Sequence, residues 1–292
     1  NKHHHGDIHE YYVAKTIINA DVVISMPKIK THRKAGFTCC LKNLVGINAD
    51  KNYLPHFAMG STNMGGDEMP SISKGRTILM YSYNFVRKHI ISHTWRYLGR
   101  FSVTVLKKLK GKEKKRTEAV VNDESKETIE KIDIKDEEID LAKWLHNRIS
   151  GQNIAAGAWA GNETICNMIL DLNRIFLCCK KDGQISEHTD RKYFYIVDGI
   201  QSGMGNGPTH PIPVQVGAIA VGYNGFAIDK TILNLFGIDE DSITLYSKAK
   251  TFPYMTKGAE QKIYFNGKNV EKDDRFGCDL IAPDDWDYKC LA

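Results

Sequence analysis

The chain has 292 residues, of which 42% are hydrophobic and 10% aromatic, and its formal net charge at pH 7 is +5. This composition is too rich in apolar residues for a disordered chain, and the charge excess is too small and too dispersed to indicate a nucleic-acid-binding protein. The sequence has no apolar run of about 18 residues, the length that crosses a bilayer. We therefore expect a globular protein of the cytoplasm.

Seven cysteines occur in the chain, and four of them lie in adjacent pairs. Cys39-Cys40 and Cys178-Cys179 fall inside apolar runs, where a free thiol packs like a small hydrophobic side chain. No Cys-x-x-Cys spacing occurs in the sequence. We expect reduced thiols, as in cytosolic proteins, and no iron–sulfur cluster in this chain.

The first 110 residues contain four predicted segments. Residues 11–19 predict a short helix. Residues 22–26 predict a buried strand, because the run is apolar and β-branched and ends at Pro27. Residues 46–76 are typical of a loop. Residues 77–110 repeat apolar side chains at three-, four- and seven-residue steps, which predicts an amphipathic helix with basic residues on its other faces.

A basic cluster and an acidic stretch follow one another within residues 107–140, and such charge blocks are usually solvated and flexible. We therefore predict one α/β domain formed by 1–76 and 141–292, with a helical, charged insertion at 77–140. The chain begins at Asn1 rather than Met, and we expect it to lack an N-terminal part.

Strands and helices alternate in the second half. Residues 163–179 predict a helix with Asn162 as its N-cap, and residues 193–197 form the clearest strand pattern. Residues 216–221 predict a further strand, and 226–236 a helix. This alternation predicts an α/β fold with a mixed or mostly parallel sheet flanked by helices.

Basic and polar side chains follow the first predicted strand. Lys28 and Lys30 are two positions apart, so on an extended segment they point to the same side. Ligands of open α/β sheets bind where strands end, and clustered ammonium groups attract phosphate or carboxylate. The candidates for holding such an anion are Lys28, Lys30, Thr31, Lys42 and Asn43. A solvated basic loop is an equally good interpretation.

Histidine and carboxylate side chains form a second set. Histidine combined with a carboxylate is a recurrent metal-site composition. The candidate ligands of a divalent metal ion are His56, Asp67 and Glu68. Their spacing is loose, and roles in hydrogen bonding or substrate contact are the alternative.

The predicted strand ends at Asp198, and a glycine-rich loop is predicted from Gly199 to Pro213. Glycines let backbone N–H groups approach an anion closely. The candidate contacts in this loop are Gly205, Asn206 and Gly207. A tight loop organised by Asp198 is the alternative. The candidates for proton transfer in the whole chain are His32, His56 and Asp198.

These stretches together resemble one known family. Residues 20–32, which include Lys-Ile-Lys-Thr-His, and residues 41–46, which begin Leu-Lys-Asn, are similar to the family called domain of unknown function 362. So are the stretches 65–68, 161–164 and 197–200, and the likeness spans residues 11–240. The resemblance implies an α/β domain and no particular activity. Some members carry a ferredoxin-like iron–sulfur module, whose cysteine pattern this chain lacks.

Two functions are compatible with the sequence. The first is a protein that binds a small anionic metabolite through its lysines, as an enzyme if a histidine or Asp198 transfers a proton. The second is a non-enzymatic protein that contacts a membrane surface or a partner through the basic helix 77–110. Nucleic acid is not expected as a partner, because aromatic and basic residues are not interleaved. The sequence leaves the oligomeric state open.

Overall fold

The computed structural model describes residues 3–89, 156–187, 191–208, 210–258, 264–265, 268–269, 271, 273–284 and 286–289. The chain divides into two compact units, residues 1–71 with 157–292 and residues 72–156. Within the second unit the described helix is α3 (Lys74–His89), which confirms the start of the predicted helix 77–110. The rest of that helix and the charged segment 107–140 lie outside the described residues. The predicted domain bounds stay predictions.

The first unit is built from one sheet and several helices. The strands of the sheet are β3 (Val22–Ser25), β4 (Lys28–His32), β5 (Gly36–Thr38), β6 (Lys192–Met204) and β7 (Ile212–Gly222). The helices are α1 (Lys15–Asn19), α2 (Cys40–Asn43), α6 (Glu163–Cys178), α7 (Gly225–Leu235), α8 (Thr244–Ala249) and α9 (Pro253–Thr256). Two small hairpins are β1 (His4–His5) with β2 (Ile8–His9), and β8 (Tyr264–Phe265) with β9 (Lys268–Asn269). Short 3₁₀ helices cover Leu44–Ile47, Lys51–Tyr53, Thr62–Met64 and Glu240–Ser242.

The sheet is mixed, as the sequence predicts. β6 is the central strand: β3 and β4 run parallel to it, and β7 runs antiparallel to it. Tyr195 pairs with both β3 and β7, and Asp198 pairs with both β4 and β7. β3 and β4 therefore lie one after the other along the same edge of β6, with β7 along the other edge. The Pro27 carbonyl continues the pairing between them, since it accepts a hydrogen bond of 2.8 Å from the Asp198 N–H.

Two segments predicted as loops are strands. Residues 28–32 form β4 rather than a basic loop, because they pair with β6 on one side and with β5 on the other. The first part of the predicted glycine-rich loop, residues 199–204, instead extends β6 to Met204 and pairs with β7, and the loop itself begins at Gly205. In both segments, partners distant in the sequence supply the hydrogen bonds of an extended backbone.

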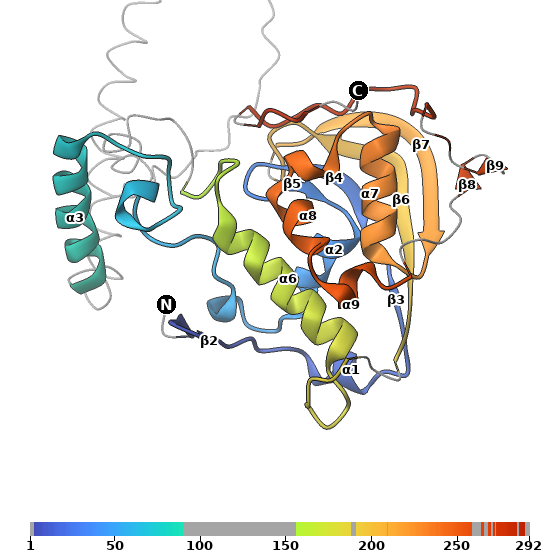
Figure 1. Cartoon of the computed structure of the whole chain (residues 1–292), viewed down its shortest axis with the longest axis horizontal. Coiled ribbons are helices and arrows are strands. Elements are labelled where there is room, and N and C mark those ends of the chain that lie inside the picture. Colours follow the sequence, from blue (N-terminus) through green and yellow to red (C-terminus); the bar gives the residue numbers. More distant parts are fainter. Residues whose placement is uncertain are drawn as a thin grey trace, which may run out of the picture. The chain divides into compact units, whose positions relative to one another are not determined.

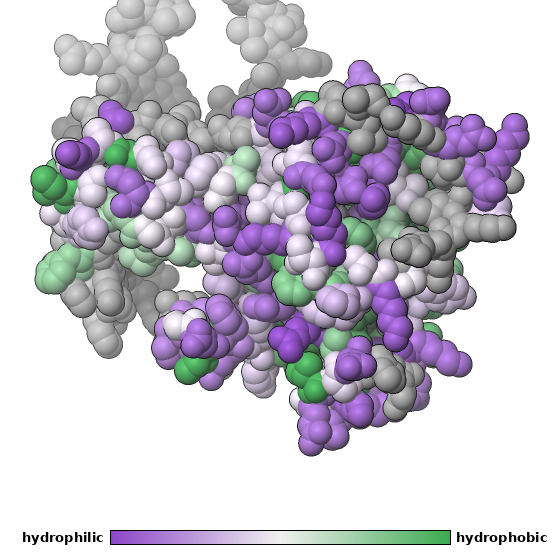
Figure 2. Space-filling model, viewed as in Figure 1, coloured by the Kyte–Doolittle hydropathy of each residue, from purple (hydrophilic) through white to green (hydrophobic). Residues whose placement is uncertain are grey.

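The helices of the first unit cover one face of the sheet. In Figure 1, α6, α7 and α8 lie together in front of the strands. Their apolar side chains and those of the strands form one buried cluster. Its members include Ile29, Phe37, Ile169, Phe176, Tyr195, Val197, Leu233 and Tyr246. Hydrophilic side chains are spread over the outer surface of these helices (Figure 2), as expected for amphipathic elements. None of the described helices is long and apolar enough to span a membrane.

Asn162 caps α6, as the sequence predicts. Its side-chain oxygen accepts a hydrogen bond of 3.1 Å from the Ile165 N–H, and its amide donates to the carbonyl of Gly157 at 2.7 Å. The cap therefore satisfies an N–H group that the first turn of a helix leaves unpaired.

The opposite face of the sheet is more open. Val22 and Ile24 on β3 and Ile219 and Val221 on β7 are all more than half exposed. Met26, between β3 and β4, and Ile200 on β6 are also more than half exposed. The β4 part carries polar side chains instead.

Candidate functional site

Side chains of β4 alternate between the core and a polar surface. Ile29 and Thr31 are buried, and Ile29 belongs to the apolar core. Since successive side chains of a strand point to opposite faces, Lys28, Lys30 and His32 lie together on the other face. β4 thus presents the candidate cations and the candidate histidine on one surface, as predicted from the spacing of Lys28 and Lys30.

Lys28 and Asp198 form an ion pair. Lys28 faces Asp198 in the sheet register, and its Nζ lies 2.6 Å from the carboxylate. The same Nζ donates to the Gln201 carbonyl at 2.7 Å. The hydrogen bond from Lys28 holds the pKa of Asp198 below its usual range. Lys28 and Asp198 therefore satisfy each other, and in this arrangement Asp198 is an ionised hydrogen-bond acceptor within the sheet.

Lys30 and Lys42 differ from Lys28 in having no acidic partner. Across the part of the chain that the structure describes, neither side chain has a hydrogen-bond or ion-pair partner. Lys42 lies on α2 and is partly buried, and this burial together with the nearby Lys30 ammonium lowers its pKa to about 8. Two like charges thus stand close together, without compensation from the described residues.

His32 is buried beside these lysines, with only 7% of its surface exposed. Its Nδ1 accepts hydrogen bonds from the N–H groups of Lys34 and Ala35 at 3.1 and 3.2 Å. Burial first, and then the charges of Lys42 and Lys34, lower its pKa to about 3. The ring is therefore neutral at pH 7 with its proton on Nε2, which makes Nε2–H a hydrogen-bond donor.

His56 and Lys34 complete this group. His56 contributes to the lowered pKa of His32, so the two rings are near each other. Burial, and then the charges of Lys34 and Lys42, also lower the pKa of His56, whose Nδ1 lies 2.9 Å from the Leu54 carbonyl. The Lys34 ammonium lies 5.2 Å from the centre of the Phe57 ring. We call the set of Lys30, His32, Lys34, Lys42 and His56 the lysine–histidine cluster.

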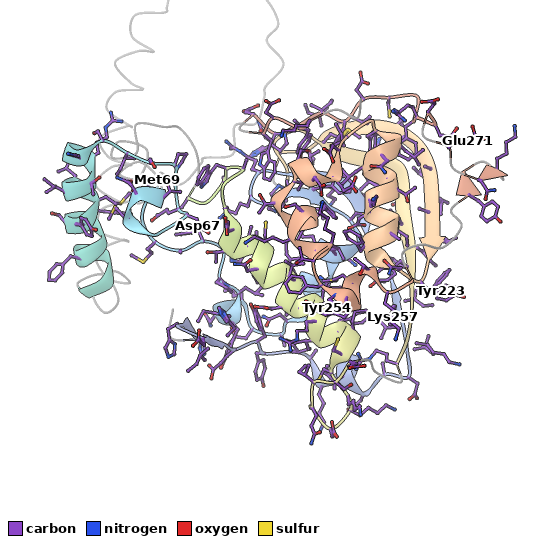
Figure 3. All side chains as sticks on the ribbon, in the orientation of Figure 1. Asp67, Met69, Tyr223, Tyr254, Lys257 and Glu271 are labelled. Carbon is purple, nitrogen blue, oxygen red and sulfur yellow. The ribbon has the colours of Figure 1, made fainter. Side chains whose placement is uncertain are left out.

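Asp67 and Glu68 organise the loop beside this cluster. The Asp67 carboxylate accepts hydrogen bonds from the N–H groups of Ala58 and Thr164, the latter at 2.7 Å. Figure 3 shows Asp67 next to the first turn of α6. The Glu68 carboxylate accepts from the Gly60 N–H at 3.1 Å and is fully buried. Both predicted metal ligands therefore bind backbone N–H groups, and with His56 they do not form a metal-binding group within the described residues.

The predicted glycine contacts are held inside the fold. Thr31 Oγ1 donates to the Gly205 carbonyl at 2.8 Å, and the Arg33 N–H donates to the Gly207 carbonyl at 3.1 Å. The N–H groups of both glycines donate to other carbonyls, and Asn206 bonds to Asp284. Gly207 has no room for a side chain, because a Cβ there would lie 2.4 Å from the Thr31 oxygen. This loop ties β4 to the C-terminal segment instead of presenting free amides to a ligand.

Asn43 also has a partner within the fold. Its amide donates to Ser25 Oγ at 3.0 Å, which joins the end of α2 to the end of β3. Asn43 is exposed and lies next to Lys42 in the sequence. It therefore helps to hold the turn on which Lys42 lies.

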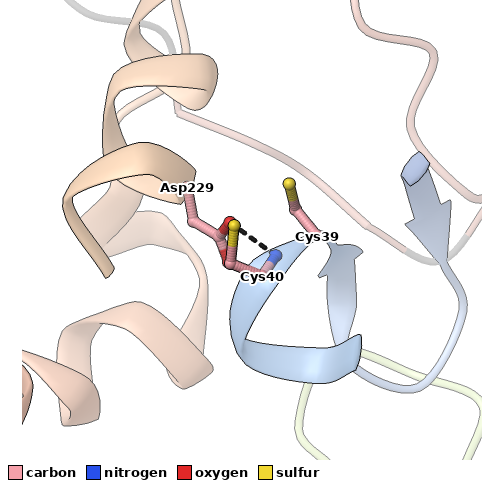
Figure 4. Close-up of side chains that lie close together, drawn as sticks. All are labelled: Cys39, Cys40 and Asp229. Carbon is pink, nitrogen blue, oxygen red and sulfur yellow. Dashed lines mark hydrogen bonds between the residues drawn. The ribbon is translucent and has the colours of Figure 1, made fainter. Parts of the chain in front are cut away.

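Asp229 is the residue that sequence reasoning missed. It comes from α7, is fully buried, and accepts a hydrogen bond of 2.7 Å from the Cys40 N–H (Figure 4). It also accepts hydrogen bonds of 3.0 Å from the Leu41 N–H and from Tyr246 Oη. It thereby fixes the start of α2, the helix that carries Lys42. Its signal in the sequence is a carboxylate on the apolar stripe of a helix, three residues after Phe226 and three before Ile232.

Asp229 also forms a group with two thiols. Cys39, Cys40 and Asp229 are the three described residues whose donor atoms lie within 4.8 Å of one another. Burial raises the pKa of Cys39 to about 12, so its thiol keeps its proton at neutral pH. The Asp229 oxygens are already bonded to backbone and tyrosine donors. The group fits a hydrogen-bonded core better than a thiolate metal site, in agreement with the predicted reduced core thiols.

These observations define an α/β protein with a helix-covered mixed sheet and a polar cluster of lysine and neutral histidine on its β4 strand. The chain belongs to the family described as domain of unknown function (DUF362), whose model matches residues 1–234. This match confirms the resemblance seen in the sequence. No curated protein and no solved structure matches the chain significantly.

Proposed function

We propose that the protein binds a small metabolite bearing a phosphate or carboxylate group at the lysine–histidine cluster. One observation carries the proposal: the ammonium groups of Lys30 and Lys42 are near each other and have no acidic partner in the described part of the chain. Partly buried charges are normally paired, because removing them from water without compensation is costly. An anionic ligand would supply the missing charge.

His32 provides the third contact in this proposal. The His32 ring stays neutral throughout the physiological pH range, so its Nε2–H can orient the ligand by a hydrogen bond without adding a positive charge. A neutral imidazole can polarise a substrate oxygen through such a hydrogen bond. Lys28 and Asp198 are left out of the contact set, because each already satisfies the other.

Replacing either Lys30 or Lys42 with methionine should weaken binding of inorganic sulfate or phosphate by about tenfold to 100-fold. This range corresponds to roughly 1.5–3 kcal/mol for one charge-assisted hydrogen bond. Calorimetric titration, together with the rise in melting temperature that each anion produces, measures the effect. The matched control is Lys257→Met, which removes an exposed lysine with the same change in charge. Equal binding by the wild type and all three variants, or no binding at all, would contradict the proposal.

The same variants separate a binding role from a structural one. In the absence of anions, Lys30→Met and Lys42→Met remove a repulsion between like charges, so neither should lower the melting temperature. Sulfate affinity should also be constant from pH 5 to 7 and should fall above about pH 8, where Lys42 loses its proton. Sulfate suits this pH series because it stays a dianion throughout. A variant that unfolds more easily without anions would indicate that the lysine supports the fold instead.

A further inference from the structure

The helix that carries Lys42 is fixed by buried side chains at its start. Lys42 lies on a four-residue helix whose start is fixed by Asp229, and the Leu41 carbonyl accepts a hydrogen bond of 2.9 Å from the buried Asn173 amide. The lysine itself has no hydrogen-bond partner among the described side chains. An immobilised helix thus carries an amine whose nitrogen is not engaged by the fold.

The surroundings of Lys42 favour its neutral form. With a pKa of about 8, roughly 10% of this amine is unprotonated at pH 7, against about 0.04% for a lysine of ordinary pKa. Burial and an adjacent cation are the two conditions under which a lysine becomes a nucleophile toward carbonyl groups. Both conditions are met here, by the position of Lys42 on α2 and by Lys30.

His32 supplies a hydrogen-bond donor for the oxygen of a bound carbonyl group. Because its Nδ1 accepts from two backbone N–H groups, the neutral ring presents Nε2–H on its other side. Lys42 is close enough to His32 to lower the pKa of the ring. An amine nucleophile and a neutral hydrogen-bond donor therefore occur in one cluster, with the Lys30 ammonium beside them.

We infer that Lys42 forms an imine with a small carbonyl compound that also bears an acidic group, such as a 2-oxo acid. This inference rests on the proposed function, since Lys30 is taken to hold the acidic group while Lys42 attacks the carbonyl carbon. It narrows the ligand from any small anion to an anionic aldehyde or ketone.

The step balances without an oxidant or a reductant. The Lys42 Nζ lone pair forms a bond to the carbonyl carbon, and the C=O π pair moves to the oxygen, which accepts a hydrogen bond from His32 Nε2–H. A proton passes from nitrogen to oxygen to give the carbinolamine. A second proton, from solvent, lets the hydroxyl leave as water while the nitrogen lone pair forms the C=N bond. The sum is amine, carbonyl and one proton in, and protonated imine and water out.

Trapping with borohydride tests the inference. The protein is incubated briefly with limiting glyoxylate at pH 7, sodium borohydride reduces any imine to a stable secondary amine, and peptide mass spectrometry gives the occupancy at each lysine. Lys42 should be labelled at least about tenfold more than the exposed Lys257 in the same sample, because far more of it is unprotonated. In the variant Lys30→Met, the preference for Lys42 should fall and its labelling should need a higher pH.

Two further arms distinguish the failure of this inference from that of the proposed function. Formaldehyde replaces glyoxylate as a carbonyl without a charge, and sulfate is added as a competing anion without a carbonyl. We expect glyoxylate to be preferred over formaldehyde at Lys42 and sulfate to compete with it. If Lys42 is labelled no more than Lys257 by either reagent while sulfate still binds, the imine is wrong and the anion site stands. If formaldehyde labels Lys42 as well as glyoxylate does and sulfate does not compete, the acidic substrate and the anion site both fail.

Discussion

Asp229→Ala should destabilise the protein by about 3–5 kcal/mol, because three donors inside the fold lose their acceptor at once. These donors are the N–H groups of Cys40 and Leu41 and the hydroxyl of Tyr246, and the site is fully buried, so water cannot replace the carboxylate. Denaturant unfolding monitored by circular dichroism measures the loss. The substitution should also loosen α2 and with it the position of Lys42.

Two variants calibrate this expectation. Tyr246→Phe removes one of the three donors together with its need for a partner, and should cost about 1 kcal/mol. Asp21→Ala removes an exposed carboxylate that pairs with Lys181, and should change stability little, because water screens the pair. If Asp229→Ala proves no more costly than Asp21→Ala, the carboxylate does not hold the start of α2.

The stability of the wild type should fall steeply in acid, and His32 should account for a large part of the loss. Its pKa is about 3 in the folded protein, whereas a histidine in an unfolded chain titrates near 6.5. Between these values the unfolded chain takes up a proton that the folded chain does not, so stability is fully present above pH 6.5 and decreases as the pH falls toward 3. At roughly 1.4 kcal/mol per pH unit, the loss approaches about 5 kcal/mol at pH 3.

The variant His32→Asn isolates this contribution. The asparagine oxygen can accept from the N–H groups of Lys34 and Ala35 as Nδ1 does, but it takes up no proton in this range. The difference in unfolding free energy between His32→Asn and the wild type should therefore change with pH from 6.5 to 3. The control substitution is His5→Asn, at an exposed histidine outside the lysine–histidine cluster. Parallel pH profiles for the wild type and His32→Asn would show that His32 is protonated in the folded protein.

Elements with local signals could be predicted from the sequence. The apolar, β-branched run 22–26 is β3, and the predicted helix 226–236 is α7 within one residue at each end. Asn162 caps α6 as expected. In each case, the residues that determine the structure lie within a few positions of one another, so the pattern can be recognised from the local sequence without knowledge of tertiary contacts.

Elements that depend on distant partners could not be predicted. β4 alternates lysine with isoleucine and threonine, and its short polar sequence resembles a loop until β6, more than 160 positions away, supplies the hydrogen bonds. The Lys28–Asp198 ion pair could not be predicted for the same reason, because its two residues are equally far apart in the sequence. In this pair the Asp198 carboxylate, a candidate base, is bonded to Lys28. The roles of Lys30, His32, Lys42 and His56 in binding and proton transfer stay predictions. The role of Asp67 as a cap for α6 could be seen only once both segments were placed.

The pairing of β3 and β4 with β6, whose register shifts between Lys28 and Lys30, constrains how this protein can change in length. Pro27 does not end the extended path but carries it on through its carbonyl group. Deleting or inserting one residue between Val22 and His32 would therefore reverse the facing of every side chain beyond that point, turning Ile29 outward and Lys30 and His32 into the core. Gaps among relatives should avoid this segment and collect in turns such as 180–184, where an added residue does not change which face of the sheet a side chain occupies.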